Sequence, residues 1–288
     1  MHLVPGRRAL RLLVMLLTLV GLIGVAGPAS ADDRHGGSYS ASYLALGDSV
    51  PFGYRGNQPP ELYRIPQLFV GYPEIVAHDF RIAELNASCP GETTDSFIDQ
   101  NAQSNGCENS LGSPIGYRDL YPLHVNYGGS QLQYAVQTLQ QDRDVQLVTL
   151  QLGANDGFLC QKAPQPYCSG ATDLAGIATH VGQNLAAILA TLRTEGNYTG
   201  KIVVVTYYAL DYNDPVGVAG VQALNAAITA AAGTAGATVA DGFAAFQPLA
   251  LQAGGSSIAA GLVLPNDVHP TLFGQALLAR AVEQAVGH

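Results

Sequence analysis

The stretch Tyr43-Leu44-Ala45-Leu46-Gly47-Asp48-Ser49-Val50-Pro51-Phe52-Gly53 is an apolar run that leads into a serine with glycines on both sides. The run Tyr43 to Leu46 predicts a buried β-strand, and the flanking glycines allow the backbone to turn sharply and present the Ser49 hydroxyl. A nucleophile would be placed at such a turn. An ordinary Asp-Ser turn, in which both side chains satisfy local backbone groups, explains the stretch equally well. Other parts of the chain therefore have to distinguish a nucleophile from an ordinary turn residue.

Short β-branched runs alternate along the chain with longer segments rich in alanine and leucine, which indicates an α/β fold with a parallel sheet. We predict strands at Tyr43–Leu46, Ile82–Asn86, Val145–Leu152, Lys201–Thr206 and Thr238–Ala240. We predict helices at Tyr72–Phe80, Ser130–Gln140, Leu174–Thr194, Val218–Ala232 and Phe273–Val286. Five strands suffice for one doubly wound sheet, and right-handed crossovers bring their carboxyl ends to one edge, where ligands bind.

Four polar motifs fall at or near that edge. Three follow strands: Ser49 after the first, Gly91 after the second, and Asn155 in Gly153-Ala154-Asn155-Asp156 after the third; His269-Pro270 precedes the last helix. The stretches 86–129 and 153–170 read as long polar loops, and long ordered loops at one edge are usually functional. Each motif alone can be explained by a structural role as a turn, a helix cap or a loop residue. Such structural roles do not explain why all four motifs fall at the same edge of the sheet.

Together these residues supply what ester cleavage requires. Ser49 can attack the carbonyl, and His269 can take its proton. The backbone N–H groups of Ser49 and Gly91, with the side-chain amide of Asn155, can donate hydrogen bonds to the oxyanion that forms. An amide suits that task because it donates without carrying charge or competing as a base.

The N-terminus is typical of a secretory signal peptide. Three arginines precede an apolar run from Leu12 to Val25, and Ala29-Ser30-Ala31 follows it, so we predict cleavage after Ala31. We expect residues 32–40 to be a disordered leader. No later segment reads as long and apolar enough to span a bilayer, so we expect a secreted protein with no stable membrane anchor.

Removal of residues 1–31 takes away three arginines and no acidic residue, so the net charge moves from −9 to −12. An acidic chain with thinly spread lysine and arginine is not expected to bind nucleic acid. The remaining residues suffice for one sizeable α/β domain, at 41–288, with 48% hydrophobic content to form a core. We expect a monomer.

The four cysteines of an exported chain are expected to form disulfides. They allow three pairings, of which we favour the local ones, Cys89–Cys107 and Cys160–Cys168, because each would close a polar loop containing glycine and proline. Their spacing does not match a zinc site. We expect no metal and no organic cofactor.

Gly47-Asp48-Ser49, Gly91, Gly153-x-Asn155-Asp156 and His269-Pro270 resemble the four ordered blocks of the GDSL, or SGNH, hydrolases. The resemblance runs from about Tyr43 to the end of the last helix. It implies an esterase or lipase on a flavodoxin-like, three-layer α/β/α fold. It also implies that Ser49 is the nucleophile, that Ser49, Gly91 and Asn155 donate to the oxyanion, and that His269 is the base.

The resemblance departs at the third member of the triad. The family usually has Asp three residues before the histidine, whereas this chain has Asn266 there and Asp267 two residues before His269. An extended segment would point Asp267 toward the imidazole, and a tight turn would favour Asn266 or a main-chain carbonyl. We favour Asp267, because a carboxylate both holds the histidine tautomer and stabilises the imidazolium.

The sequence therefore predicts a secreted serine hydrolase that cleaves small-molecule, lipid or acylated-glycan esters through an acyl-enzyme. A polysaccharide O-acetylesterase would use the same residues. A metal-dependent phosphoesterase, with Asp156, Asp241, Asp267 and His269 as ligands, is a further alternative, although no ligand spacing requires it. The last alternative is a binding module that retains the fold but has no catalytic activity, because the fold alone does not determine the function.

Overall fold

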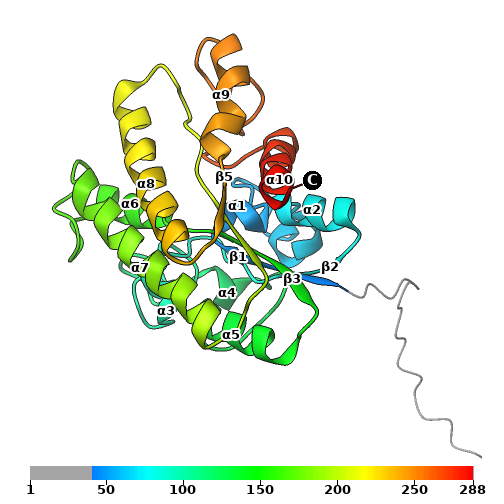
Figure 1. Cartoon of the computed structure of the whole chain (residues 1–288). Coiled ribbons are helices and arrows are strands. Elements are labelled where there is room, and N and C mark those ends of the chain that lie inside the picture. Colours follow the sequence, from blue (N-terminus) through cyan, green and yellow to red (C-terminus); the bar gives the residue numbers. More distant parts are fainter. Residues whose placement is uncertain (1–40, 288) are drawn as a thin grey trace, which may run out of the picture. The chain divides into compact units, whose positions relative to one another are not determined.

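A five-stranded parallel sheet, in the order β2-β1-β3-β4-β5, lies at the centre of the protein (Figure 1). The computed structural model describes residues 41–287, so the predicted signal peptide (1–31) and leader (32–40) lie outside the described residues. The strands are β1 Ser42–Gly47, β2 Ala83–Asn86, β3 Val145–Gln151, β4 Lys201–Val205 and β5 Thr238–Ala240. This order is that of the flavodoxin-like doubly wound sheet, which confirms the predicted fold class.

Helices cover both faces of the sheet. On one face α2 (Tyr72–Phe80) packs against α10 (Leu272–Val286), which contacts β4 and β5. On the other face lie α5 (Gln131–Gln141), α7 (Leu174–Thr194) and α8 (Pro215–Thr234). These five helices are the ones the sequence predicts, with ends that differ by up to three residues. The result is a three-layer α/β/α arrangement (Figure 1).

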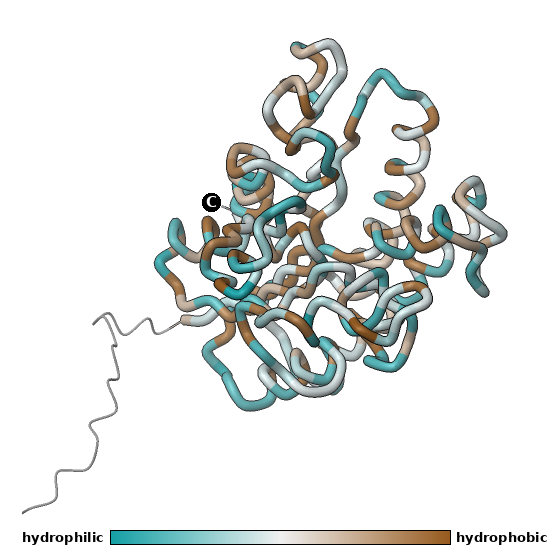
Figure 2. Tube along the Cα trace, turned by 180° about the vertical axis from the view of Figure 1, so that it is seen from behind, coloured by the Kyte–Doolittle hydropathy of each residue, from teal (hydrophilic) through white to brown (hydrophobic). Residues whose placement is uncertain are grey.

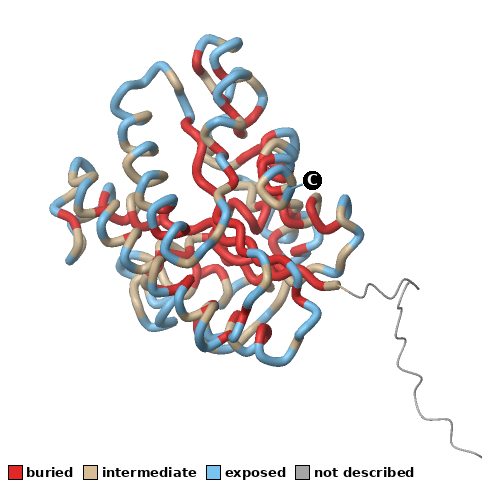
Figure 3. Tube along the Cα trace, viewed as in Figure 1, coloured by how far each residue is buried: buried red, intermediate tan, exposed pale blue. Residues whose placement is uncertain are grey.

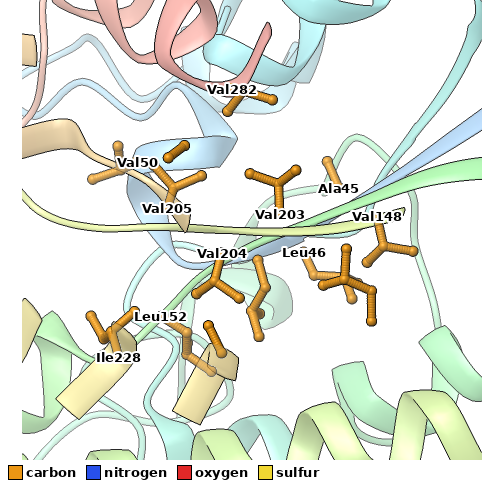
Figure 4. Packing of buried hydrophobic residues seen from close by; sticks show 14 of the residues in the cluster. Ala45, Leu46, Val50, Val148, Leu152, Val203, Val204, Val205, Ile228 and Val282 are labelled. Carbon is orange, nitrogen blue, oxygen red and sulfur yellow. The ribbon is translucent and has the colours of Figure 1, made fainter. Parts of the chain in front are cut away.

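Alternate side chains of a strand point to opposite sides of the sheet, and helices cover both sides. The sheet is therefore buried on both faces. In β4, Val203 and Val205 point toward Val282 of α10, whereas Val204 points toward Ile228 of α8 (Figure 4). All five side chains are buried. Apolar and buried residues accordingly gather at the sheet in the centre of the domain (Figures 2 and 3). This is why the strands appear in the sequence as continuous apolar runs.

Two segments expected to be polar loops contain helices. Residues 86–129 include α3 (Thr94–Ile98) and α4 (Tyr117–Leu120), and 153–170 includes α6 (Ala154–Lys162). The first turn of α6 holds asparagine, aspartate and glycine, which have low helix propensity, so tertiary contacts through buried Leu159 and Cys160 hold this helix.

A further helix, α9 (Gly242–Gln252), was not predicted, and Pro248 lies inside it. Its start carries a signal that was available in the sequence, because the Asp241 carboxylate caps it by accepting from the Ala244 N–H at 3.0 Å. The short helix α1 (Ser49–Phe52) and two 3₁₀ turns, Leu62–Arg64 and Pro66–Leu68, complete the described elements.

The prediction that no later segment could span a membrane was wrong on length and composition. Helix α8 has 20 residues, none of them charged, and is long and apolar enough to cross a bilayer by those measures alone. Its apolar character comes mainly from alanine, valine and glycine. In the structure α8 packs against α7 and contacts β4 and β5.

Both predicted disulfides are present. Cys89–Cys107 follows β2, and Cys160–Cys168 joins the last turns of α6 to the loop before α7. The first crosslink holds two backbones against each other: a β-carbon at Gly91 would lie 2.7 Å from the backbone of Gly106. The turn that contains Gly91 is therefore fixed from outside the sheet.

Candidate active site

Ser49 is the first residue of α1, directly after β1. The preceding Gly47 has a φ of +135°, and a β-carbon there would lie 2.0 Å from the carbonyl oxygen of Gln151 in β3. Only glycine lets the chain leave the sheet so close to its neighbour strand. The Asp48 carboxylate caps α1 by accepting from the Val50 N–H at 2.9 Å. The turn thus presents Ser49 at the carboxyl edge of the sheet, as the sequence analysis expected of a nucleophile.

A chain of hydrogen bonds joins Ser49 to a histidine and a carboxylate. The Ser49 Oγ lies 2.9 Å from the His269 Nε2, and the His269 Nδ1 lies 2.5 Å from the Asp267 Oδ1. The three side chains come from opposite ends of the sequence and meet beyond the carboxyl end of β1. This geometry is that of a nucleophile, a base and an orienting group.

Asp267, and not Asn266, contacts the imidazole. The segment is a tight turn, in which the Asp267 N–H donates to the Leu264 carbonyl at 3.3 Å, and Asn266 has a φ of +56° and an exposed side chain. The expectation that a tight turn would favour Asn266 or a carbonyl was therefore wrong. The left-handed residue at 266 points its own side chain to solvent and brings the next one, Asp267, toward His269.

The Asp267 carboxylate is held in its charged form. Burial alone raises its pKa, but the hydrogen bond and the charge of His269, with N–H donors from Gly56 and Val268, outweigh burial and lower the pKa to about 2. The Gly56 N–H lies 2.9 Å from the Asp267 Oδ2. Each oxygen therefore has a fixed partner, so the carboxylate can hold one imidazole orientation.

Asn155 lies near the start of α6 with a side chain that is 5% exposed. Its Oδ1 accepts from the Asn105 Nδ2 at 2.7 Å, and its Nδ2 donates to the Glu92 carbonyl at 3.0 Å. These bonds fix which way the amide faces. An amide nitrogen has two N–H groups, so one donor remains for a ligand beside Ser49.

Gly91 lies one residue before the carbonyl that Asn155 contacts, in a left-handed turn with a φ of +88°. It does not line the pocket found among the described residues, whereas Ser49, Asn155 and His269 do. The turn is braced from behind by Gln131 of α5, whose Nε2 donates to the Gly47 carbonyl at 3.0 Å and to the Glu92 Oε2 at 2.9 Å. The sequence carried no signal for Gln131, because this contact depends on tertiary structure.

Asp48 does not contact the reacting groups. Its second oxygen accepts from the Tyr207 hydroxyl at 2.5 Å, and the residue is almost fully buried. Burial raises the pKa of Asp48 to about 6, although the bonds from Tyr207 and Val50 lower it. Asp48 is therefore a brace that ties the serine turn to the segment after β4.

The pocket has a volume of about 410 Å³ and extends from the site toward α7 and α8. Apolar residues from α6, α7 and α8 dominate its wall, among them Phe158, Ile177, Val221 and Leu224. The sequence analysis did not single out these positions. A signal existed in the 3- and 4-residue spacing of apolar and glycine positions in the first half of α8.

The residues of the phosphoesterase alternative do not form one donor set. Asp241 caps α9, and Asp267 is engaged by His269. Asp156 is buried and accepts from the Thr94 hydroxyl at 2.6 Å, in a cluster with Asp95 and His180. Within residues 41–287, no group of three metal-capable side chains includes Asp267 or His269.

Residues 45–277 match the model of the GDSL-like Lipase/Acylhydrolase family, and the chain belongs to this family. The protein is therefore a carboxylic ester hydrolase on a three-layer α/β/α fold. No curated protein matches the chain in sequence.

Solved structures share the fold. The acetylxylan esterase Axe2 from Geobacillus stearothermophilus aligns with a TM-score of 0.56 at 17% identity, over 87% of this chain and 95% of that one. LAE5, an alpha/beta hydrolase enzyme from the metagenome of Lake Arreo, Spain, aligns with a TM-score of 0.56 at 15% identity, over 86% of this chain and 96% of that one.

Proposed function

We propose that the protein is a serine esterase that cleaves carboxylic esters through an acyl-enzyme intermediate. The observation that carries this proposal is the hydrogen-bonded chain from the Ser49 Oγ through the His269 imidazole to the Asp267 carboxylate. Ser49 and His269 line the wall of a pocket that a substrate can enter.

These contacts support both halves of the reaction, the acylation of Ser49 and its deacylation. His269 Nε2 takes the proton of the Ser49 hydroxyl as the Oγ bonds to the ester carbonyl carbon, and then returns it to the alcohol oxygen as the carbon–oxygen bond breaks. Water repeats the sequence on the acyl-enzyme: its proton passes to His269, the acid leaves, and the proton returns to the Ser49 Oγ. Asp267 stays ionised throughout and stabilises the imidazolium.

The oxyanion would be held by the backbone N–H groups of Ser49 and Gly91 and by the Asn155 Nδ2. The contact of Asn155 with the Glu92 carbonyl supports this role, because it ties the amide to the turn that carries Gly91. Asn155 and Ser49 also line the same pocket.

Replacement of Asn155 by alanine is expected to lower kcat by about 10²- to 10³-fold with a small change in KM, because the donor acts on charge that develops in the transition state. Steady-state hydrolysis of a p-nitrophenyl ester measures both constants. Asn101→Ala is the matched control, since the exposed Asn101 amide contacts Asp99 and lies outside the pocket, and both constants should stay unchanged in this variant. An Asn155→Ala variant that loses binding and not turnover would contradict the assignment.

An alkyl p-nitrophenyl phosphonate tests the nucleophile. We expect Ser49 to bond to phosphorus and release one equivalent of p-nitrophenolate as activity is lost, with the mass increase on the peptide that contains Ser49. A label on another residue, or undiminished ester hydrolysis after complete labelling, would refute the proposal.

Polysaccharide O-acetylesterase is the second candidate, supported by the shared fold with an acetylxylan esterase. An aromatic group also lies beside the base: the Tyr54 ring meets the His269 ring edge-on, with centroids 5.0 Å apart. Rates on acetylated xylan and on p-nitrophenyl decanoate, measured side by side, separate the candidates. Faster turnover of the decanoate supports an esterase for longer acyl chains.

We also propose that the enzyme is exported after cleavage behind Ala31. The two disulfides support this, because such bonds form and persist in oxidising compartments. The N-terminal sequence of protein recovered from the culture medium tests it, and a chain that begins at Met1 would contradict it.

A further inference from the structure

The pocket continues from the site into a groove between two helices. We define the α7–α8 groove by Leu174 and Ile177 on one side and by Gly217, Gly220, Val221 and Leu224 on the other; all six residues line the pocket. On α8, Gly220 and Val221 both lie three or four residues from Gly217 and from Leu224, so the four positions form one face of the helix. The face is apolar and, at Gly217 and Gly220, has no side chain.

The groove runs outward from the reacting groups. Leu224 lies at its inner end, because a β-carbon at Gly153, two residues before Asn155, would lie 3.5 Å from the Leu224 Cδ1. Val216 lies at its outer end and is 76% exposed, so the groove reaches the surface there. Eight residues of helix separate these ends by about 12 Å. That distance matches about ten carbon atoms of an extended chain, because carbon–carbon bonds near 1.5 Å follow a zigzag.

The chemistry of the wall selects an uncharged, apolar occupant. None of the residues that line the pocket is lysine or arginine, so an anionic group would find no cationic partner there. Three polar side chains of the wall already have partners. Tyr207 donates to Asp48 and Tyr208 to the Val268 carbonyl at 2.6 Å, and Asp214 caps α8. A sugar would leave its hydroxyl groups unpaired in such a groove, whereas a hydrocarbon chain would bury apolar surface.

We propose that the α7–α8 groove binds the acyl chain of the substrate, and that Gly220 keeps it open for chains of about ten carbons. This inference rests on the proposed serine esterase function. Gly220 has no side chain beside Leu174 of the opposite wall, and a β-carbon there would make an ordinary van der Waals contact with the Leu174 Cδ2, at 3.6 Å. A leucine side chain at this position therefore has to occupy the groove itself.

The variant Gly220→Leu tests the inference with p-nitrophenyl acetate and p-nitrophenyl decanoate. We expect kcat/KM for the decanoate to fall about tenfold or more, because several methylene groups lose their site, while kcat/KM for the acetate stays within about twofold. The fold should persist, because leucine has a higher helix propensity than glycine.

Gly233→Leu is the matched control. Gly233 lies in the same helix but outside the groove, with no atom within 4 Å of a β-carbon placed there, and both rates should remain unchanged in this variant. A parallel loss on both esters in Gly220→Leu, or no loss on either, would overturn the groove assignment. Ser49→Ala, assayed beside it, separates the two proposals. Full activity in that variant refutes the esterase proposal, whereas an inactive Ser49→Ala with an unselective Gly220→Leu refutes the groove alone.

Discussion

Ser49→Ala is expected to lower kcat for ester hydrolysis by about 10⁵- to 10⁶-fold. The Oγ is the atom that would bond to the carbonyl carbon, and no neighbouring hydroxyl can replace it. The residual rate above that of water would come from the oxyanion donors and from substrate binding, which the substitution leaves in place. Release of p-nitrophenol under single-turnover and steady-state conditions measures the loss.

The stability of Ser49→Ala should match that of the parent protein. The Ser49 Oγ forms a hydrogen bond with the His269 Nε2. Because His269 is partly exposed, a water molecule can form this bond in the variant. Equal melting temperatures would therefore attribute the lost activity to chemistry. Ser169→Ala, an exposed serine in the loop before α7, serves as the control and should keep full activity. A Ser49→Ala variant that keeps more than a few per cent of the activity would rule out the acyl-enzyme route.

The sheet could be predicted from sequence because its signal is local. Strands buried on both faces must be apolar, so runs such as Ile202–Val205 stand out, and the alternation with helices then limits the topology to a few choices. Helix α6 could not be predicted in this way. Its first turn has a poor helix propensity, and its stability comes from buried contacts and from a disulfide to Cys168 in the loop that follows it.

The approach of Ser49, Asn155 and His269 to one pocket could be predicted as well, because each follows a strand or precedes a helix at one edge. What surrounds them could not. The brace that Gln131 forms behind Gly47, and the wall that Leu224 forms near Gly153, depend on helices that approach from the far face of the sheet. The choice of Asp267 over Asn266 could not be read from the sequence either, because it follows from a turn in which Asn266 adopts a φ of +56° and exposes its side chain.

The second large loss of activity is expected from a substitution at Asp267. Asp267→Asn is expected to lower kcat by about 10³- to 10⁴-fold with a small change in KM, because an amide can fix the imidazole in the wrong tautomer and cannot stabilise the imidazolium. The carboxylate is well placed for both tasks, since its Oδ1 lies 2.5 Å from the His269 Nδ1. The pKa of Asp267 is lowered to about 2, so the charge is present throughout the range in which the enzyme can be assayed.

The same lowered pKa sets the pH at which this contact fails. For a carboxylate whose pKa is lower in the folded than in the unfolded protein, the stabilisation is complete above the unfolded value near 4 and is lost as the pH falls through about 2. The melting temperatures of the parent protein and of Asp267→Asn should therefore differ most above pH 4 and converge toward pH 2. Asn266→Gly is the matched control, because glycine accepts the φ of +56° and the Asn266 side chain is exposed. This variant should keep kcat within about twofold, and the opposite pattern, an active Asp267→Asn beside an inactive Asn266→Gly, would move the orienting role to Asn266.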